Sequence, residues 1–377
     1  MTGRDRDVPH RVSSPLELLF DLVFVVAVSQ ASQNLHHLLS EGHGWRSVLA
    51  YLMVFFAVWW AWMNFTWFGS AFDTDDWAYR AMTIVQMGGV LVLAAGVHAA
   101  MVSGEWDVVT WGYVIMRLAM VGQWLRAGLS DRAARPVAFA YAVGVTVVQV
   151  LWVARIYLLD AEWQFLTFFA LAVCEVLVPV IAERRGSTAW HPHHIAERYG
   201  LFTLILLGES ILASASAIFD ALREGEHTGQ LTLLGIAALV IAAGMWWVYF
   251  ARDQGSRLTS ARRAFGFGYM HYLIFAAAGA ASAGIEVDID LTLGRTELSA
   301  FGAASALTIP VGVFVLAAWF VLLRGVVARA ASVVVALLGV AILAAALVPV
   351  TPAVSVAVLL VVIVVVLEVD AARRRSA

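Results

Sequence analysis

The sequence predicts an all-α fold, a polytopic transmembrane helical bundle of about twelve spans, and three observations support it. Of the 377 residues, 62% are hydrophobic and only 14% are charged, whereas an average soluble domain carries about 25% charged residues. The mean hydropathy is +0.83. Apolar runs recur along the whole chain, each long enough to cross ~30 Å of hydrocarbon as a helix. A water-soluble protein of this composition would have to bury nearly every helix on all sides.

Charged residues and breaks rich in Gly and Pro divide the apolar runs into candidate helices. The last two candidates are separated only by "VPVTP" at 348–352, where two prolines predict a tight turn. The predicted spans are 16–39, 46–70, 79–103, 107–128, 135–156, 162–183, 197–220, 230–252, 264–287, 298–322, 330–347 and 352–370.

Several classes of segment and partner are not expected. The polar start "MTGRDRDVPHRVSSP" and the long, acidic first span do not fit a cleavable signal peptide. The single Cys174 excludes an intramolecular disulfide. A net charge of −3 predicts no nucleic-acid partner. Nucleotide-binding and nucleophile-elbow motifs are missing from the sequence, so we expect no cofactor and do not favour an enzyme.

The arginines orient the predicted bundle, because cytoplasmic loops of membrane proteins carry more Arg and Lys than outside loops. With the N-terminus in the cytoplasm, cytoplasmic segments hold 19 arginines and outside loops hold 4. Only Arg117 lies far from both ends of its span. The distribution predicts that both termini are cytoplasmic.

Two stretches suggest an internal repeat. "LVLAAGVH" at 91–98 and "GAASAGIE" at 279–286 share an Ala-Gly pair at an offset of 188 residues, and the same offset places Asp21 opposite Glu209. Halves of six spans each would run parallel, related by an axis along the membrane normal. The predicted organisation is a cytoplasmic segment at 1–15, six-helix halves at 16–187 and 188–370, and a cytoplasmic basic tail at 371–377.

Three motifs occur in a characteristic order. They are "SPLELLFDLVFVVAVSQ" at 14–30, "TWFGSAFDTDDWAYR" at 66–80 and "ERYGLFTLILLGESI" at 197–211. Together they resemble the bacterial low temperature requirement protein A family, LtrA, over nearly the whole chain. The resemblance implies a multi-pass protein of the bacterial inner membrane, linked by name to growth in the cold. It does not imply an established biochemical activity.

Glu17 and Asp21 lie one turn apart on one face of the first span. Two like charges held this close in a low dielectric repel each other. The pair could therefore bind a proton or a cation. Alternatively, Glu17 caps the helix start, where the dipole favours an anion, and Asp21 bonds to a neighbouring helix.

Glu209 and Arg117 lie deepest in their spans. Glu209 follows Glu197 by 12 residues, about 18 Å along a helix, so its carboxyl must be neutral, paired or facing water. A packing hydrogen bond is the alternative to a proton site. Arg117 stays charged and needs a carboxylate or an anion. Its candidate partners are Asp21, Glu175 and Glu209, either in a structural ion pair or in a proton relay.

Glu175 and His271 are further candidates for a substrate- or proton-binding site. Glu175 lies inside the sixth span and His271 two turns into the ninth. A histidine within a membrane can carry protons, but it can also donate a single packing hydrogen bond.

Two polar segments lie between spans. "HPHH" at 191–194 raises the question of a metal site, since His194 and Glu197 are three residues apart if the helix extends back. A loop histidine cluster with no acid or thiol partner argues against a metal, and Pro192 can simply start the helix, so no metal site is predicted. In "DTDD" at 73–76, Arg80 follows Asp76 by four residues, which predicts an ion pair at a helix start.

Three functions remain open. The first is a proton- or ion-coupled secondary transporter of a small molecule or ion, with Asp21 and Glu209 as equivalent site residues compensated by Arg117. The second is a membrane-embedded lipid-modifying enzyme. The third is a non-catalytic membrane factor needed for growth at low temperature. Membrane lipids are expected partners in all three, and the sequence favours the transporter.

Overall fold

Twelve long helices make up the part of the chain that the computed structural model describes, residues 2–3, 12–225, 227–348 and 351–376. All twelve are long and apolar enough to span a membrane, so the all-α, twelve-span prediction is confirmed. The helices are α1 (Pro15–Ser40), α2 (Trp45–Ala71), α3 (Trp77–Val102), α4 (Asp107–Ser130), α5 (Arg135–Leu158), α6 (Ala161–Ala182), α7 (Pro192–Glu224), α8 (Thr228–Phe250), α9 (Ala261–Thr292), α10 (Ala300–Ala318), α11 (Arg329–Ala344) and α12 (Pro352–Arg375).

The helix ends follow local sequence signals. α7 begins at Pro192, five residues before the predicted start at 197, because proline suits the first turn, where its missing N–H is not needed. α9 begins after Ser260, whose side chain accepts a hydrogen bond from the Arg263 N–H. Glycines with positive φ follow the ends of α3 and α9, Gly104 at 73° and Gly294 at 66°, a backbone conformation that favours glycine.

Shorter elements complete the chain. Thr2–Gly3 (β1) and Phe72–Asp73 (β2) form a two-stranded antiparallel ladder. One 3₁₀ turn lies at Gly255–Arg257 and another, Ala345–Leu347, extends α11. A π-helical turn at Trp319–Leu323 follows α10. Residues 349 and 350, in the predicted "VPVTP" turn, lie outside the described residues.

By internal packing the chain divides into two compact units. The first consists of Met1–Gln30 and Met53–Arg198, and the second of Ala31–Leu52 and Tyr199–Ala377. Helices α1, α2 and α7 therefore contribute to both units. The predicted repeat of two six-helix halves stays a prediction.

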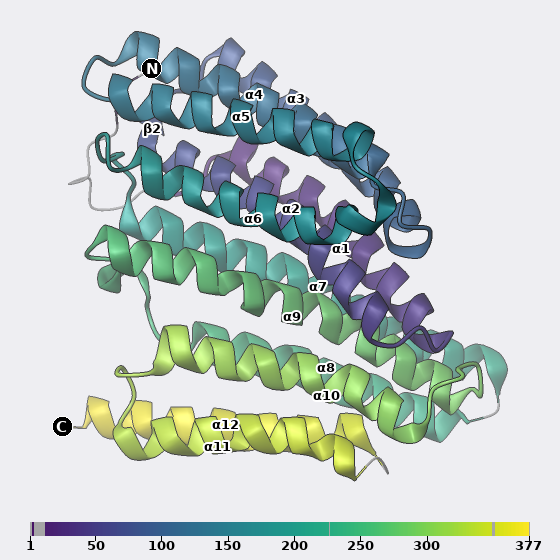
Figure 1. Ribbon diagram of the computed structural model, residues 1–377. Helices are drawn as coiled ribbons and strands as arrows, with labels where there is room; N and C mark the ends of the chain where they lie inside the picture. The colour runs from purple at the N-terminus through teal and green to yellow at the C-terminus, as the bar shows by residue number, and fades with distance from the viewer. Residues whose placement is uncertain (1, 4–11, 226, 349–350, 377) are drawn as a thin grey trace. The chain divides into compact units, whose positions relative to one another are not determined.

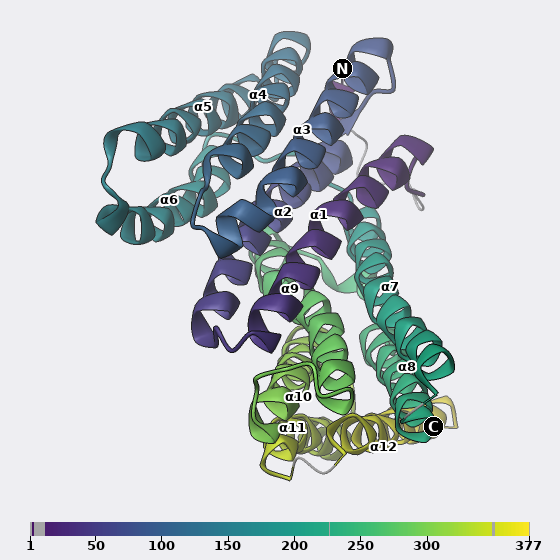
Figure 2. The same ribbon diagram turned by 90° about the vertical axis from the view of Figure 1, so that its right-hand side faces the viewer.

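Consecutive helices pack on one another within each unit, as short loops favour. In the first unit α3 packs on α4, α4 on α5 and α5 on α6 (Figure 1). In the second unit α9 packs on α10, α10 on α11 and α11 on α12, and α8 packs on α12 (Figure 2). Helical spans satisfy all their interior backbone hydrogen bonds internally, which the membrane interior requires.

Candidate functional site

The six candidate residues from the sequence fall into four places. Glu17 and Asp21 belong to one buried cluster in the first unit, and Arg117 and Glu175 belong to another. Glu209 lines a polar cavity in the second unit. His271 is buried elsewhere in the second unit among aromatic rings.

The carboxylate of Asp21 forms a bidentate ion pair with Arg198. The guanidinium of Arg198 donates from Nε to Asp21 Oδ2 at 3.0 Å and from Nη2 to Oδ1. The indole of Trp62 donates to Oδ1 at 2.7 Å. Both Asp21 and Arg198 are fully buried. Two parallel hydrogen bonds from a guanidinium to a carboxylate are a strong, directional pairing, so this carboxylate is fixed between α1, α2 and α7.

Glu17 shares the same guanidinium, and together Glu17, Asp21, His194 and Arg198 form the Glu17 cluster. Arg198 Nη1 lies 3.4 Å from Glu17 Oε1, and His194 Nε2 lies 3.2 Å from the same oxygen. The Ser14 N–H donates to Glu17 Oε2 at 2.7 Å, so Glu17 also caps the start of α1. Protonated His194 would balance the second carboxylate.

The Glu17 cluster corrects two sequence predictions. Arg117 does not compensate Asp21, because Arg198, which lies in the predicted seventh span, does. "HPHH" does have an acid partner, since His194 contacts Glu17. The start of α7 at Pro192 accounts for the second difference, because it places His194 within the helix.

Glu175 is the centre of a second cluster, the Glu175 cluster, which contains Trp60, Tyr113, Arg117, Gln149 and Glu175. Its Oε1 accepts hydrogen bonds from the Tyr113 hydroxyl and the Gln149 amide, both at 2.8 Å. Its Oε2 accepts from the Trp60 indole and from Arg117 Nη2, both at 2.9 Å. The donors come from α2, α4 and α5, and Glu175 itself lies on α6. Of the three carboxylates predicted as possible partners of Arg117, Glu175 is therefore the one that pairs with it.

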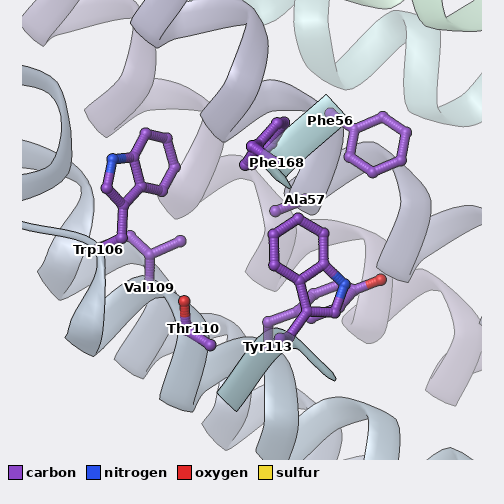
Figure 3. A pocket seen from close by; sticks show the side chains of 8 residues that line it. Phe56, Ala57, Trp106, Val109, Thr110, Tyr113 and Phe168 are labelled. Atoms are coloured by element: carbon purple, nitrogen blue, oxygen red, sulfur yellow. The ribbon is translucent and has the colours of Figure 1, made fainter. Parts of the chain in front are cut away.

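A small aromatic pocket borders the Glu175 cluster. Tyr113 lines it together with Phe56, Ala57, Trp106, Val109, Thr110, Trp152 and Phe168. Figure 3 shows the rings of Phe56, Trp106 and Phe168 around it. Its volume is about 20 Å³, which is room for one water and little more. The pocket is therefore too small for a transported solute.

Arg155 is a further buried arginine of the first unit. It lies in α5, where Nη2 donates to the Gln164 carbonyl at 2.6 Å and Nε donates to it at 3.1 Å. Its guanidinium carbon lies 5.6 Å from the ring centroids of Trp152 and Phe168. Cation–π contacts of this kind stabilise a cation away from water, which allows burial of Arg155 without a carboxylate partner among the described residues.

His271 uses both ring nitrogens for packing. Nδ1 lies 2.6 Å from the Phe267 carbonyl and Nε2 lies 2.9 Å from the Tyr249 hydroxyl. A carbonyl only accepts, so Nδ1 carries the hydrogen, and the neutral ring accepts the Tyr249 proton at Nε2. The side chain is fully buried and lines none of the cavities described here. This geometry fits the packing interpretation better than a proton carrier.

Glu209 lines a cavity of about 130 Å³ between α1, α7 and α9, which we call the Glu209 cavity. A second glutamate, Glu286 on α9, lines the same cavity. Both side chains are half-buried. The other lining residues are Ser32, Gln33, His36, Leu212, Ala213, Ser216, Ser282 and Ala283. A cavity of this size with so many polar groups has room for several waters.

Sequence reasoning missed Glu286 and His36, although helical spacing could have found them. On α1, Ser32, His36 and Ser40 recur every four residues. On α9, Ser282, Glu286 and Asp290 do the same. Polar side chains at this interval form a stripe along one face of an otherwise apolar helix. Such a stripe within a span indicates an interior or water-lined face.

A larger pocket in the second unit has a different character. It measures about 470 Å³, and its lining is aliphatic apart from residues such as Tyr51 and Ser305. The Tyr51 hydroxyl is already used, since it donates to the Ala276 carbonyl at 2.8 Å. No carboxyl or imidazole group is among its lining residues. Carboxyl and imidazole groups line the Glu209 cavity and not this pocket.

"DTDD" also pairs differently from the prediction. Arg80 forms a bidentate ion pair with Asp75, in which Nη2 donates to Oδ2 at 2.7 Å. Asp76 instead accepts the Tyr79 N–H at 3.0 Å as the cap of α3 and pairs with Arg126 of α4. The donors from Arg126 and Tyr79 lower the pKa of Asp76 from its usual value. The predicted ion pair between Asp76 and Arg80 does not form, because the capping geometry turns the Asp76 side chain toward the helix start.

Comparison with known proteins agrees with the three sequence motifs. The family model of the bacterial low temperature requirement A protein (LtrA) matches residues 12–369. An uncharacterized protein of Rhizobium meliloti (strain 1021) is 28% identical over 288 residues, which cover 70% of this chain and 67% of that protein. No solved structure matches the chain.

Proposed function

The chain belongs to the bacterial low temperature requirement A (LtrA) family, and we propose that it is a proton-coupled secondary transporter in which Glu209 binds the coupling proton. It is a multi-pass membrane protein with twelve helices of spanning length. The observation that carries the proposal is the Glu209 cavity, where two glutamates share a polar space within spanning helices. The inner membrane and cytoplasmic termini are part of the proposal.

Energetics favours a site of this kind at Glu209. An acid near the middle of a span costs about 2.5–3.5 kcal/mol on insertion scales unless it is solvated or paired. Two carboxylates that line one small cavity repel each other when both are charged, so a proton between them is stabilised. Intramembrane acids of this kind are typical of proton relays in transporters.

The buried clusters of the first unit have a different character. In the Glu175 cluster the single carboxylate pairs with the guanidinium of Arg117 and accepts further hydrogen bonds, and in the Glu17 cluster Glu17 and Asp21 share the guanidinium of Arg198. Removing one partner of such a pair leaves an uncompensated buried charge. We therefore assign Asp21, Glu17, Arg117 and Glu175 to positioning the helices, and Glu209 to proton binding.

Infrared difference spectroscopy tests the proton site without knowledge of the substrate. Purified protein in lipid bilayers is titrated with pH, and wild type is compared with Glu209→Gln, Glu286→Gln and the control Glu162→Gln, an exposed acid on α6. We expect a carboxyl band that follows bulk pH, is lost in Glu209→Gln and is unchanged in Glu162→Gln. Identical spectra for wild type and Glu209→Gln would overturn the proposal.

Transport itself is tested in sealed vesicles with a pH-sensitive dye inside. A panel of small polar and cationic solutes is added against a proton gradient. We expect at least one solute to dissipate the gradient with wild-type protein and not with Glu209→Gln. If the panel, extended over the main classes of small solutes, moves no protons, the transporter proposal fails.

The apolar pocket of about 470 Å³ favours one second candidate, an enzyme that modifies lipids. An aliphatic pocket between spanning helices has the chemistry to hold an acyl chain. Comparing the lipid composition of cells with and without the gene, grown at low temperature, separates this candidate from the transporter. An altered acyl-chain or headgroup profile supports the enzyme, and an unchanged profile excludes it.

A further inference from the structure

We propose that His36 and Asp290 form a proton-exchange pair that connects the Glu209 cavity with water at one end of the second unit. This inference rests on the proposed proton site at Glu209. It assigns a role to two residues that the sequence analysis did not select.

The pair is linked directly to the cavity. His36 lines the Glu209 cavity, and its Nε2 lies 2.6 Å from Asp290 Oδ2. The Ser40 hydroxyl donates to the same oxygen at 2.8 Å. Asp290 lies one turn beyond the cavity residue Glu286 on α9. One imidazole therefore borders the cavity and contacts a carboxylate outside its lining.

The pair also lies where water can reach it. Asp290 is two residues from the end of α9 at Thr292, and His36 is one turn from the end of α1 at Ser40. The end of α1 contacts the segment between α9 and α10, since the Glu297 N–H donates to the Ser40 carbonyl at 2.8 Å. The side chains of His36 and Asp290 are 13% and 19% exposed. Proton exchange with bulk water needs only such partial access.

The groups around Asp290 favour its charged carboxylate, which can accept a proton from His36. A carboxylate in the last turn of a helix is disfavoured by the helix dipole, and here a histidine and a hydroxyl offset this by hydrogen bonding. Arg295 interacts electrostatically with Asp290. The titratable and charged groups around His36 are His37 on α1, Glu209 on α7, Glu286 and Asp290 on α9, and Arg295 and Glu297 after α9.

Imidazole can pass a proton because uptake of a proton on one nitrogen allows release of a proton from the other. A proton taken up from the cavity on one nitrogen makes the ring a cation. The proton on the other nitrogen then leaves to Asp290, which releases it to water, and the ring returns to neutral. The neutral ring is then left with its hydrogen on the nitrogen that took up the proton. A flip of the ring restores the starting tautomer and completes a cycle in which one proton crosses and no electron moves. His271 lacks this arrangement, because its nitrogens bond a carbonyl and a tyrosine hydroxyl inside a closed aromatic shell.

The test measures how fast Glu209 responds to pH. Time-resolved infrared spectroscopy follows its carboxyl band after a light-triggered pH drop in wild type, His36→Gln and Asp290→Asn. The control is His98→Gln, an exposed histidine on α3. We expect protonation of Glu209 to slow at least tenfold in both test variants and to reach the same final amplitude. Added imidazole should restore the rate in His36→Ala.

The outcomes separate this inference from the proposed function. If the wild type shows no Glu209 band, the proton site itself is wrong. If the band is present and His36→Gln and Asp290→Asn respond at the wild-type rate, the proton-exchange pair is wrong and the Glu209 site stands. If His36→Gln does not fold, Asp290→Asn and Ser40→Ala decide, because each leaves the imidazole in place.

Discussion

Glu175 and Glu209 are both glutamates inside spanning helices, but their carboxyls face different surroundings. An ionised carboxylate has about four lone-pair positions, and four donors approach Glu175. Glu209 lines a cavity that has room for water and is also lined by a second glutamate, Glu286. A transported proton needs an acceptor that solvent can reach. We therefore assign proton binding to Glu209 and helix positioning to Glu175, although their sequence surroundings look alike.

Replacing Glu175 by glutamine should strongly destabilise the first unit. Arg117 is 1% exposed and would lose its only carboxylate partner among the described residues. Breaking a buried ion pair from one side costs about 3–5 kcal/mol. The measurement is the melting temperature of purified protein in detergent.

A double-variant cycle gives the control for this expectation. Arg117→Met alone should also destabilise, whereas Arg117→Met combined with Glu175→Gln should lose less stability than the sum of the two single changes. Glu162→Gln, on the same helix as Glu175 but exposed, should melt as wild type does. Additive losses in the double variant would show that the pair is not coupled.

At the scale of single elements, the start of α3 combines a helix cap with a link to α4. Asp76 accepts the Tyr79 N–H, as a capping residue does, and it also pairs with Arg126 of α4. These contacts lower the pKa of Asp76. The hydrogen bond from Arg126 has the larger effect and the one from the Tyr79 N–H the smaller. The α2–α3 junction therefore depends on a charged Asp76.

We predict that Asp76 makes stability depend on pH in the acid range. Because its folded pKa is lowered, its contribution is complete above the unfolded value of about 3.9 and is lost as pH falls through the folded pKa. Asp76→Asn keeps a good cap but loses the charge pair, so its melting temperature should fall below wild type at pH 7 and converge with it in strong acid.

Asp76→Ala separates the cap from the charge pair. It should lose about 1 kcal/mol more than Asp76→Asn, because alanine removes the cap as well. Melting curves for the three proteins between neutral and strongly acid pH measure both effects. A constant gap between wild type and Asp76→Asn at every pH would contradict the assignment.

For the molecule as a whole, hydropathy predicted the architecture well. All twelve helices were anticipated, since a bilayer admits only helices or closed barrels and a spanning helix needs about 20 apolar residues. The predicted seventh span begins at 197 because the residues from Pro192 to Glu197 are polar, whereas α7 begins at Pro192. His194, in the added turn, contacts Glu17.

The partners within the candidate sites were less predictable. Arg198 and Asp21 are 177 residues apart in sequence, and Glu175 collects donors from three other helices. No local pattern encodes such pairings, because they depend on which helix faces pack together. Depth within a span did single out Glu209, since the cost of an isolated charge depends on depth.

Two glycines offer a test of whether the halves are built alike. A Cβ added to Gly96 on α3 would lie 2.6 Å from the Val109 backbone nitrogen on α4. A Cβ added to Gly284 on α9 would lie 2.7 Å from Leu307 Cα on α10. The two glycines are related by the predicted offset of 188 residues, and each lets a helix pair approach closely within its own unit.

We predict that Gly96→Ala and Gly284→Ala each destabilise the protein by a similar amount, about 1–3 kcal/mol, because the added methyl group overpacks a backbone contact. The matched controls are Gly88→Ala on α3 and Gly266→Ala on α9, where a Cβ would meet nothing within 4 Å. These should stabilise slightly, by about 0.4–1 kcal/mol, since alanine restricts the unfolded chain. Melting temperatures of the four variants provide the measurement. A harmless Gly96→Ala beside a damaging Gly284→Ala would contradict equivalent packing in the two halves, and equal losses would support a duplicated origin for the α3–α4 and α9–α10 pairs.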